Sequence, residues 1–246
     1  MIESIVHEFK NQLKEHDPHL PIDKKNRMYK IINSSNPKFE SYGIKISEIE
    51  KIVREIHEKY PCSYEDAVEV FKELISSDNQ EENFSAVFFL NRFKNFFSED
   101  TITLFYNEFF KYCDSWGICD STMIRIIGPF LGKKGNEELA LSIIERWSNS
   151  KDMWVRRASM VILLKLVMIR KDFDQDHVFS LTEKMSKYSE NYIQKGIGWL
   201  LKTCSNYKPD VIFNYLMRHK TSLSRLVLRY ASEKLPKEMR NEILNK

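Results

Sequence analysis

Apolar residues recur along almost the whole chain at spacings of three and four, with short polar interruptions roughly every 12 to 18 residues. This spacing puts apolar side chains on one face of an α-helix, so it predicts a succession of amphipathic helices joined by short turns. The predicted helices span residues 2–15, 22–32, 46–59, 64–75, 82–97, 101–112, 120–131, 137–147, 153–169, 176–187, 192–204, 209–218 and 222–234, with a short tail beyond Pro236.

Some of these helices carry start signals. Ser47 and Ser63 each precede an acidic residue that would lie in a first turn, and Asp152 is predicted to be the N-cap of the helix that starts at Met153. A hydroxyl or carboxylate at such a position accepts main-chain N–H groups that have no partner within the helix. These residues therefore support the predicted boundaries.

Short connections force neighbouring helices to lie antiparallel, which predicts an all-α fold, an α-solenoid of antiparallel helix pairs of the HEAT-like kind. Seven glycines and seven prolines among 246 residues are too few for an all-β protein. We predict one domain over 1–246, in which 1–40 forms an N-terminal helical pair and 41–246 the repeat array. No strict sequence repeat is visible, so a compact helical bundle remains the alternative architecture.

The net charge of +3 is distributed unevenly. Residues 1–150 hold 19 Lys and Arg against 25 Asp and Glu, whereas residues 151–246 hold 19 against 10. The excess of positive charge in the second part suggests contact with a polyanion, and a solvated basic surface is the alternative interpretation.

Targeting and redox signals are absent from the sequence. The first residues mix charged and apolar positions, and no apolar run approaches the length of a membrane span, which favours a cytoplasmic protein with no membrane contact. The four cysteines form no C-x-x-C pair, so we expect reduced thiols. There is no P-loop, dinucleotide fingerprint or G-x-S-x-G motif, and we expect neither a metal nor a cofactor.

The stretch W-G-I-C-D places Trp116 and Asp120 four positions apart. If this stretch is helical, an aromatic surface and a carboxylate share one face. The alternative is that Asp120 caps a helix beginning at Ser121 while Trp116 packs in the core.

The stretch M-W-V-R-R-A-S places Arg156 and Arg157 near a predicted helix start, where a cation is unfavourable to the helix dipole. We therefore expect one of them to reach outward to an external anion such as phosphate, and an ordinary surface arginine is the alternative.

The stretch Y-I-Q-K-G-I-G-W-L-L has Gly196 and Gly198 inside a predicted helix, at a cost of about 1 kcal/mol each relative to alanine. Two explanations are equally good: close approach of a ligand, or tight helix packing. Lys195 lies one turn from Trp199 on the same predicted helix.

Taken in this order, the three stretches resemble the DNA alkylation repair family, the AlkD-like alkylpurine DNA glycosylases. The resemblance extends from about Tyr42 to Lys234 and includes a closing L-S-R-L-V-L-R-Y-A-S-E-K-L. It implies a HEAT-like solenoid with a concave DNA-binding face, monomeric, that excises cationic N3- and N7-alkylpurines from duplex DNA without fully extruding the lesion.

The resemblance also implies roles for residues. The catalytic aspartate corresponds to Asp120, and the residues that contact the lesion correspond to Trp116, Trp199 and, in the loosely matched N-terminal part, Tyr29. The phosphate-contacting arginine corresponds to Arg157. Further candidates for the DNA backbone are Arg156, Lys195, Arg225 and Arg229. One departure is Gly117, where the family usually has an acidic residue.

The function implied is hydrolysis of the N-glycosidic bond, leaving an abasic site in base excision repair. A carboxylate would stabilise the cationic sugar, and indole faces would add to this stabilisation. This role requires Asp120 to reach solvent. The alternative is a non-catalytic HEAT-repeat protein that binds DNA or protein.

Overall fold

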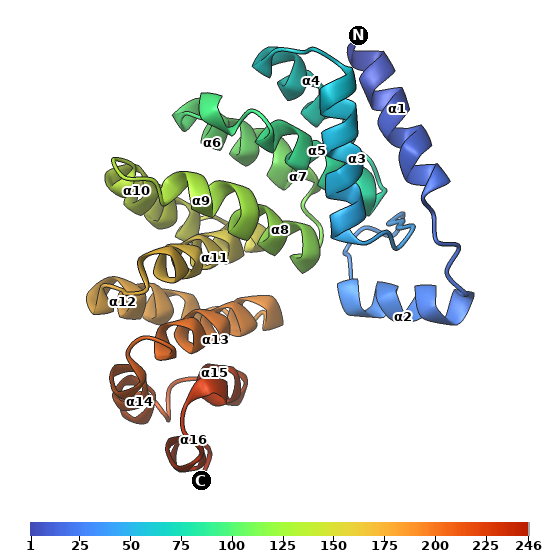
Figure 1. The fold of residues 1–246 in the computed structure, drawn as a ribbon. Coiled ribbons are helices and arrows are strands. Elements are labelled where there is room, and N and C mark those ends of the chain that lie inside the picture. Colours follow the sequence, from blue (N-terminus) through green and yellow to red (C-terminus); the bar gives the residue numbers. More distant parts are fainter. Residues whose placement is uncertain (246) are drawn as a thin grey trace. The chain divides into compact units, whose positions relative to one another are not determined.

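The computed structural model describes residues 1–245, and the regular secondary structure within this range is helical. An isolated parallel bridge between Glu40 and Asn79 is the one β-type pairing in the same range. The all-α fold of packed helix pairs predicted from the hydrophobic spacing is therefore confirmed (Figure 1).

The chain forms two compact units, Met1–Thr122 (unit 1) and Met123–Lys246 (unit 2). Unit 1 contains α1 (Ile2–Glu15), α2 (Ile22–Ile32), α3 (Ile46–Lys59), α4 (Tyr64–Ile75), α5 (Gln80–Asn91), η1 (Lys94–Phe96), α6 (Glu99–Leu104), η2 (Phe105–Phe109), α7 (Phe110–Tyr112) and α8 (Trp116–Thr122). Unit 2 contains η3 (Met123–Ile127), α9 (Gly128–Leu131), α10 (Glu137–Ser148), α11 (Met153–Arg170), α12 (Gln175–Ser186), α13 (Asn191–Ser205), α14 (Pro209–Arg218), α15 (Arg225–Ala231), η4 (Ser232–Lys234) and α16 (Lys237–Leu244).

The core of unit 1 is built around α5, which is buried along nearly its whole length. Helices α1, α3 and α4 pack against it, and α1 also packs against α3 and α4. Phe9 of α1 meets Phe89 of α5 edge to face, with ring centroids 5.4 Å apart. A helix that is covered on nearly all sides in this way is a central helix of its unit.

Helix α2 is joined to the rest of unit 1 by loops at both ends (Figure 1). Among its described residues, Ile32 is the one that is buried. The loop that follows α2 is held by the buried carboxylate of Glu81, which accepts the hydroxyl of Ser41 at 2.7 Å and the N–H of Gly43 at 2.8 Å. Gly43 has a φ of +85°, a conformation that favours glycine.

The core of unit 2 is built around α11 and α13, which pack against each other. Helix α11 also contacts α9, α10 and α12, and α13 also contacts α12, α14 and α15. Trp147 at the end of α10 is fully buried. Unit 2 is thus a succession of paired helices in which each pair packs on the next, as predicted for this part of the chain.

Several predicted boundaries agree with the structure and others do not. Ser63 forms a capping box with Asp66, and Asp152 accepts the N–H groups of Trp154 and Val155, as expected. The prediction for Ser47 is wrong, because the helix already begins at Ile46. The predicted tail beyond Pro236 is helical as α16.

The helices predicted over 101–112 and 120–131 are interrupted by the π-helical turns η2 and η3. A π-turn adds one residue to a helical turn and rotates the face that follows, which a period of 3.6 does not predict. η3 begins directly after Thr122, so α8 passes into a π-turn three residues beyond Asp120.

Candidate functional site

Trp116 and Asp120 both lie in α8, which begins at Trp116. They are one helical turn apart and share a face, as one of the two interpretations predicted. The alternative, in which Asp120 caps a helix beginning at Ser121 and Trp116 lies in the core, is wrong. Asp120 is inside the helix, and the Trp116 side chain is 36% exposed.

Asp120 is only 7% exposed, less than its expected role required. A carboxylate held away from bulk water interacts more strongly with nearby charge than one in solvent, because little water screens it. The small exposed fraction also limits the carboxylate to a ligand that approaches closely.

Tyr29 lies in α2 and is half-buried. Its hydroxyl accepts the N–H of Ser41 at 3.2 Å, and its ring meets Phe39 edge to face at 5.4 Å. These contacts tie the Tyr29 side chain to the loop after α2.

Arg156 and Arg157 do not project from α11 as expected, because both are buried, at 4% and 5% exposure. The Arg156 guanidinium donates to the carbonyls of Ser150 and Lys151 at 2.9 and 2.7 Å. It also forms an ion pair with Glu190 at 2.7 Å. Two carbonyls of the turn between α10 and α11 and one carboxylate thus satisfy a cation that is badly placed for the helix dipole.

The Arg157 guanidinium donates to the main-chain carbonyl of Tyr192, at the start of α13. Both arginines therefore contribute to joining α11 to the turn before α13. The expected outward reach of one of them is not seen, since both guanidinium groups have protein partners in unit 2.

The glycines of α13 have a packing explanation. A Cβ on Gly196 would lie 2.7 Å from the Met160 side chain of α11. A Cβ on Gly198 would overlap Tyr230 of α15 and lie 3.5 Å from the carbonyl of Val227. Of the two explanations for the glycines, the structure thus supports tight helix packing over ligand approach.

Half-buried Lys195 and Trp199 share the face of α13 that lies between the packed glycines. On α15, which packs against α13, Arg225 and Arg229 are exposed and one turn apart. These residues bring exposed positive charge and an aromatic surface together on two adjacent helices of unit 2.

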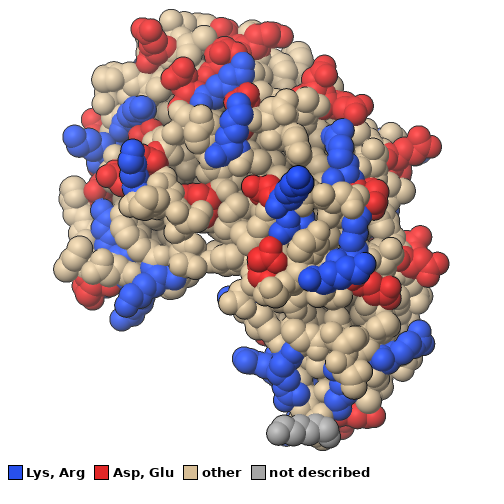
Figure 2. Space-filling view, turned by 180° about the vertical axis from the view of Figure 1, so that it is seen from behind, with Lys and Arg blue, Asp and Glu red and all other residues tan. Residues whose placement is uncertain are grey.

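The charges of the two units have opposite sign. Unit 1 holds 15 Lys and Arg against 22 Asp and Glu, and unit 2 holds 23 against 13. Figure 2 shows lysine and arginine side chains around the C-terminal end of unit 2. The charge asymmetry noted in the sequence thus follows the division of the fold, and the polyanion surface is expected on unit 2.

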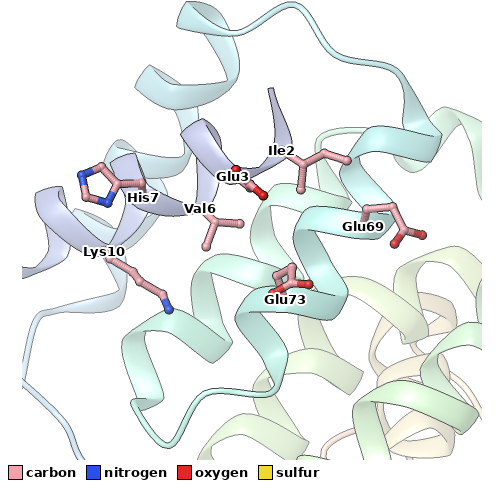
Figure 3. A pocket seen from close by; sticks show the side chains of 7 residues that line it. All are labelled: Ile2, Glu3, Val6, His7, Lys10, Glu69 and Glu73. Carbon is pink, nitrogen blue, oxygen red and sulfur yellow. The ribbon is translucent and has the colours of Figure 1, made fainter.

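A groove of about 530 Å³ lies between α1 and α4 in unit 1 (Figure 3). Three carboxylates line it, and Lys10 and His7 are the basic residues among its lining side chains. The lining residues are Ile2, Glu3, Val6, His7, Lys10, Glu69 and Glu73. The carboxylates disfavour phosphate, so this groove is not a candidate for DNA contact.

Within residues 1–245, no group of three or more His, Cys, Asp or Glu side chains is arranged to hold a metal ion. In the same range, no helix combines the length and the apolar character needed to cross a membrane.

The predicted site residues form two groups. Tyr29, Trp116 and Asp120 belong to unit 1, while Arg156, Arg157, Lys195, Trp199, Arg225 and Arg229 belong to unit 2.

The sequence analysis missed several polar residues that support these groups. In unit 2, the amide of Gln194 donates to the carbonyl of Tyr188 at 2.6 Å and accepts the hydroxyl of Ser224 at 2.5 Å, next to Arg225. In unit 1, Ser34 donates to the carboxylate of Asp114. No local pattern marks such residues, because their partners are distant in sequence.

Comparisons with known proteins bear on the fold and the family of this chain. A solved structure described as "Predicted DNA alkylation repair enzyme from Enterococcus faecalis" is similar in fold, with a TM-score of 0.72 and 20% identity. The match covers 88% of this chain and 96% of that one. A search of curated proteins finds no significant match. The family model for the DNA alkylation repair enzyme matches residues 12–235, nearly the whole chain. The chain therefore belongs to the DNA alkylation repair enzyme family.

Proposed function

We propose that this protein is a monofunctional DNA glycosylase that hydrolyses the N-glycosidic bond of cationic N3- and N7-alkylpurines in duplex DNA. The observation that carries the proposal is the pairing of Trp116 and Asp120 on one face of α8, in a chain that belongs to a DNA repair family. The product would be an abasic site, and we expect the protein to act as a cytoplasmic monomer.

An alkylpurine with a formal positive charge is a good leaving group, so its departure needs no protonation by the enzyme. When the bond from C1′ to the base nitrogen breaks, its electron pair leaves with the base and positive charge develops on the sugar. The Asp120 carboxylate stabilises this charge, and a water oxygen then bonds to C1′ and gives up a proton. The indole face of Trp116, one turn from Asp120 on α8, attracts the same cation, and a contact with the lesion is also proposed for Trp199.

The backbone contacts are proposed for Lys195, Arg225 and Arg229, which have exposed charge on α13 and α15. Arg157 is a further contact if a phosphate oxygen takes the place of the Tyr192 carbonyl as its acceptor. Arg156 has three protein acceptors, so we leave it out of the proposed DNA contacts. A contact with DNA is also proposed for the half-buried Tyr29.

The test is release of free base from a duplex oligonucleotide with a single 7-methylguanine, measured by mass spectrometry with alkali cleavage of the abasic site. We expect Asp120→Asn to reduce the single-turnover rate by at least about a hundredfold, because it removes the charge that stabilises the sugar cation. Asp100→Asn, which neutralises an exposed carboxylate of the same unit, is the matched control. Equal rates for both variants would refute the role of Asp120.

The alternative is a non-catalytic DNA-binding protein. The low exposure of Asp120 and the use of Arg157 within the fold favour it. Salt-dependent binding to methylated duplex DNA with no base release, from either 3-methyladenine or 7-methylguanine, would support this alternative over the glycosylase.

A further inference from the structure

Hydrogen bonds join the end of α2 to the segment that leads into α8, and we name this set of contacts the α2–α8 clasp. The indole Nε1–H of Trp116 donates to the carbonyl of Ile31 at 2.9 Å. The N–H of Ser35 donates to the carbonyl of Asp114 at 3.1 Å. The hydroxyl of Ser34 donates to the carboxylate of Asp114.

The clasp helps to hold α2 in place, because few residues of this helix are buried. Burial of Ile32 is the one core contribution among the described residues of α2, and its neighbour Ile31 is 61% exposed. Little apolar burial therefore opposes movement of this helix, since the hydrophobic contribution scales with buried area. The contacts of Tyr29 with Ser41 and Phe39 tie the middle of the helix to the following loop, and the polar contacts of the clasp hold its C-terminal end.

Asp114 is well suited to this task. Its side chain is half-buried, and burial raises the pKa of its carboxyl while the hydroxyl of Ser34 lowers it. Ser34 in turn accepts the N–H of Asn36 at 3.1 Å, which sets the turn after α2. One carboxylate and one main-chain carbonyl of Asp114 thus hold two consecutive serines.

We propose that Asp114 is a positioning residue: through Ser34 and Ser35 it places the Ile31 carbonyl where that carbonyl sets the plane of the Trp116 indole. The functional part rests on the proposed glycosylase activity, in which that indole faces the sugar. The indole has a single N–H donor, so one acceptor placed by α2 determines which way the ring face points.

The consequence is that α2 acts on the site without contacting substrate. An indole that loses the Ile31 carbonyl can rotate about its side-chain bonds, and its face is then presented to the sugar for only part of the time. Preorganised groups stabilise a transition state better than mobile ones, so the rate of base release falls while the affinity for DNA is retained.

The first measurement follows the tryptophan itself, in the full chain labelled with ¹⁵N-tryptophan. The chain has four tryptophans, and Trp116→Phe identifies the Trp116 indole signal. We expect Asp114→Ala to shift this signal and to speed its hydrogen exchange at least about fivefold, since the protecting bond opens more often. The signals of the other indoles are expected to stay in place.

Three further variants test the route of this effect. Ser34→Ala removes the donor of the hydrogen bond from Ser34 to Asp114. Combining it with Asp114→Ala should therefore change the Trp116 signal little further. Asp114→Asn keeps an acceptor oxygen for Ser34 and should restore most of the protection. Asp78→Ala is the matched control, because Asp78 accepts from Asn36 of the same loop at 2.8 Å and acts on Asp114 through its negative charge, whereas Ser34 donates to Asp114 itself.

The second measurement is single-turnover base release, where we expect about a tenfold loss for Asp114→Ala and near wild-type rates for Asp114→Asn. An unchanged Trp116 signal in Asp114→Ala, or an equal shift in Asp78→Ala, would overturn the clasp. Absence of base release by the wild-type protein would instead refute the proposed glycosylase and leave the spectroscopic result intact. If Asp114→Ala does not fold, Ser34→Ala gives the same two readouts.

Discussion

The carboxylate of Glu81 accepts the main-chain N–H of Gly43 at 2.8 Å, across 38 positions of the chain. The same carboxylate, 1% exposed, also accepts the N–H groups of Tyr42 and Ile44 and the hydroxyl of Ser41. A single buried side chain therefore accepts hydrogen bonds from four donors in the loop that connects α2 to α3.

Glu81→Ala would leave these donors without their acceptor, and we expect the free energy of unfolding to fall by about 3 kcal/mol. Urea denaturation followed by circular dichroism measures the loss. Glu73→Ala, on the exposed face of α4, should change it by less than about 0.5 kcal/mol. A comparable effect of the two substitutions would show that the loop does not depend on Glu81.

Gly198→Ala would push a methyl group into Tyr230 of α15. The alanine gains about 1 kcal/mol of helix propensity, but overpacking costs about 1 to 3 kcal/mol, so we expect a net loss of stability in thermal unfolding. Gly117→Ala is the contrasting variant, because its nearest atom would be 3.7 Å away. A stabilised Gly198→Ala would mean that α13 and α15 have room between them.

Arg156→Ala removes donors to two carbonyls and the ion pair with Glu190. Because the guanidinium is buried, we expect a loss of about 2 to 4 kcal/mol in the free energy of unfolding. Arg156→Lys should recover only part, since an ammonium cannot reproduce the planar fork. Exposed Arg170 of the same helix provides the control, and a neutral Arg156→Ala would argue against a structural role.

Arg225→Ala and Arg229→Ala should each weaken duplex DNA binding and lower the slope of log Kd against log salt by about 1, because each removes one phosphate contact. Fluorescence anisotropy with unmodified duplex at several salt concentrations measures this slope. Arg54→Ala, an exposed arginine of acidic unit 1, should leave it unchanged. Equal slopes for all three variants would show that α15 is not part of the DNA-binding surface.

His57 makes stability depend on pH. Burial lowers the pKa of its imidazole, and the charge of Arg92 lowers it further. The neutral ring packs edge to face on Phe93, with centroids 5.2 Å apart. Because the folded state binds the proton less well than the unfolded chain, the stabilisation is present above the unfolded pKa of about 6.5 and is lost as the pH falls below it.

His57→Phe should therefore flatten the decline in the free energy of unfolding between about pH 7.5 and pH 5, relative to the wild-type protein. Urea titrations at intervals across this range measure the two slopes. Identical slopes would show that other groups account for the pH dependence.

The hydrophobic spacing by itself determined the helical class and many element bounds. Ile2–Glu15, Tyr64–Ile75 and Pro209–Arg218 begin and end where the pattern predicts, because amphipathic periodicity and turn residues are local properties. The same locality explains why the capping role of Ser63 was predicted correctly. The order of the motifs also indicated the family that the comparisons show.

Tertiary structure decided the contacts of those polar side chains whose partners lie beyond the local helix turn. The sequence predicts that one of Arg156 and Arg157 reaches outward from the surface. In the structure both are buried in unit 2, where their guanidinium groups donate to main-chain carbonyls. Ser34 and Asp114, 80 positions apart, meet because loops of unit 1 bring them together. A helix depends on neighbours a few residues away, so the order of residues predicts it. A hydrogen bond between distant residues depends on where the two groups lie in space, which the order of residues does not give.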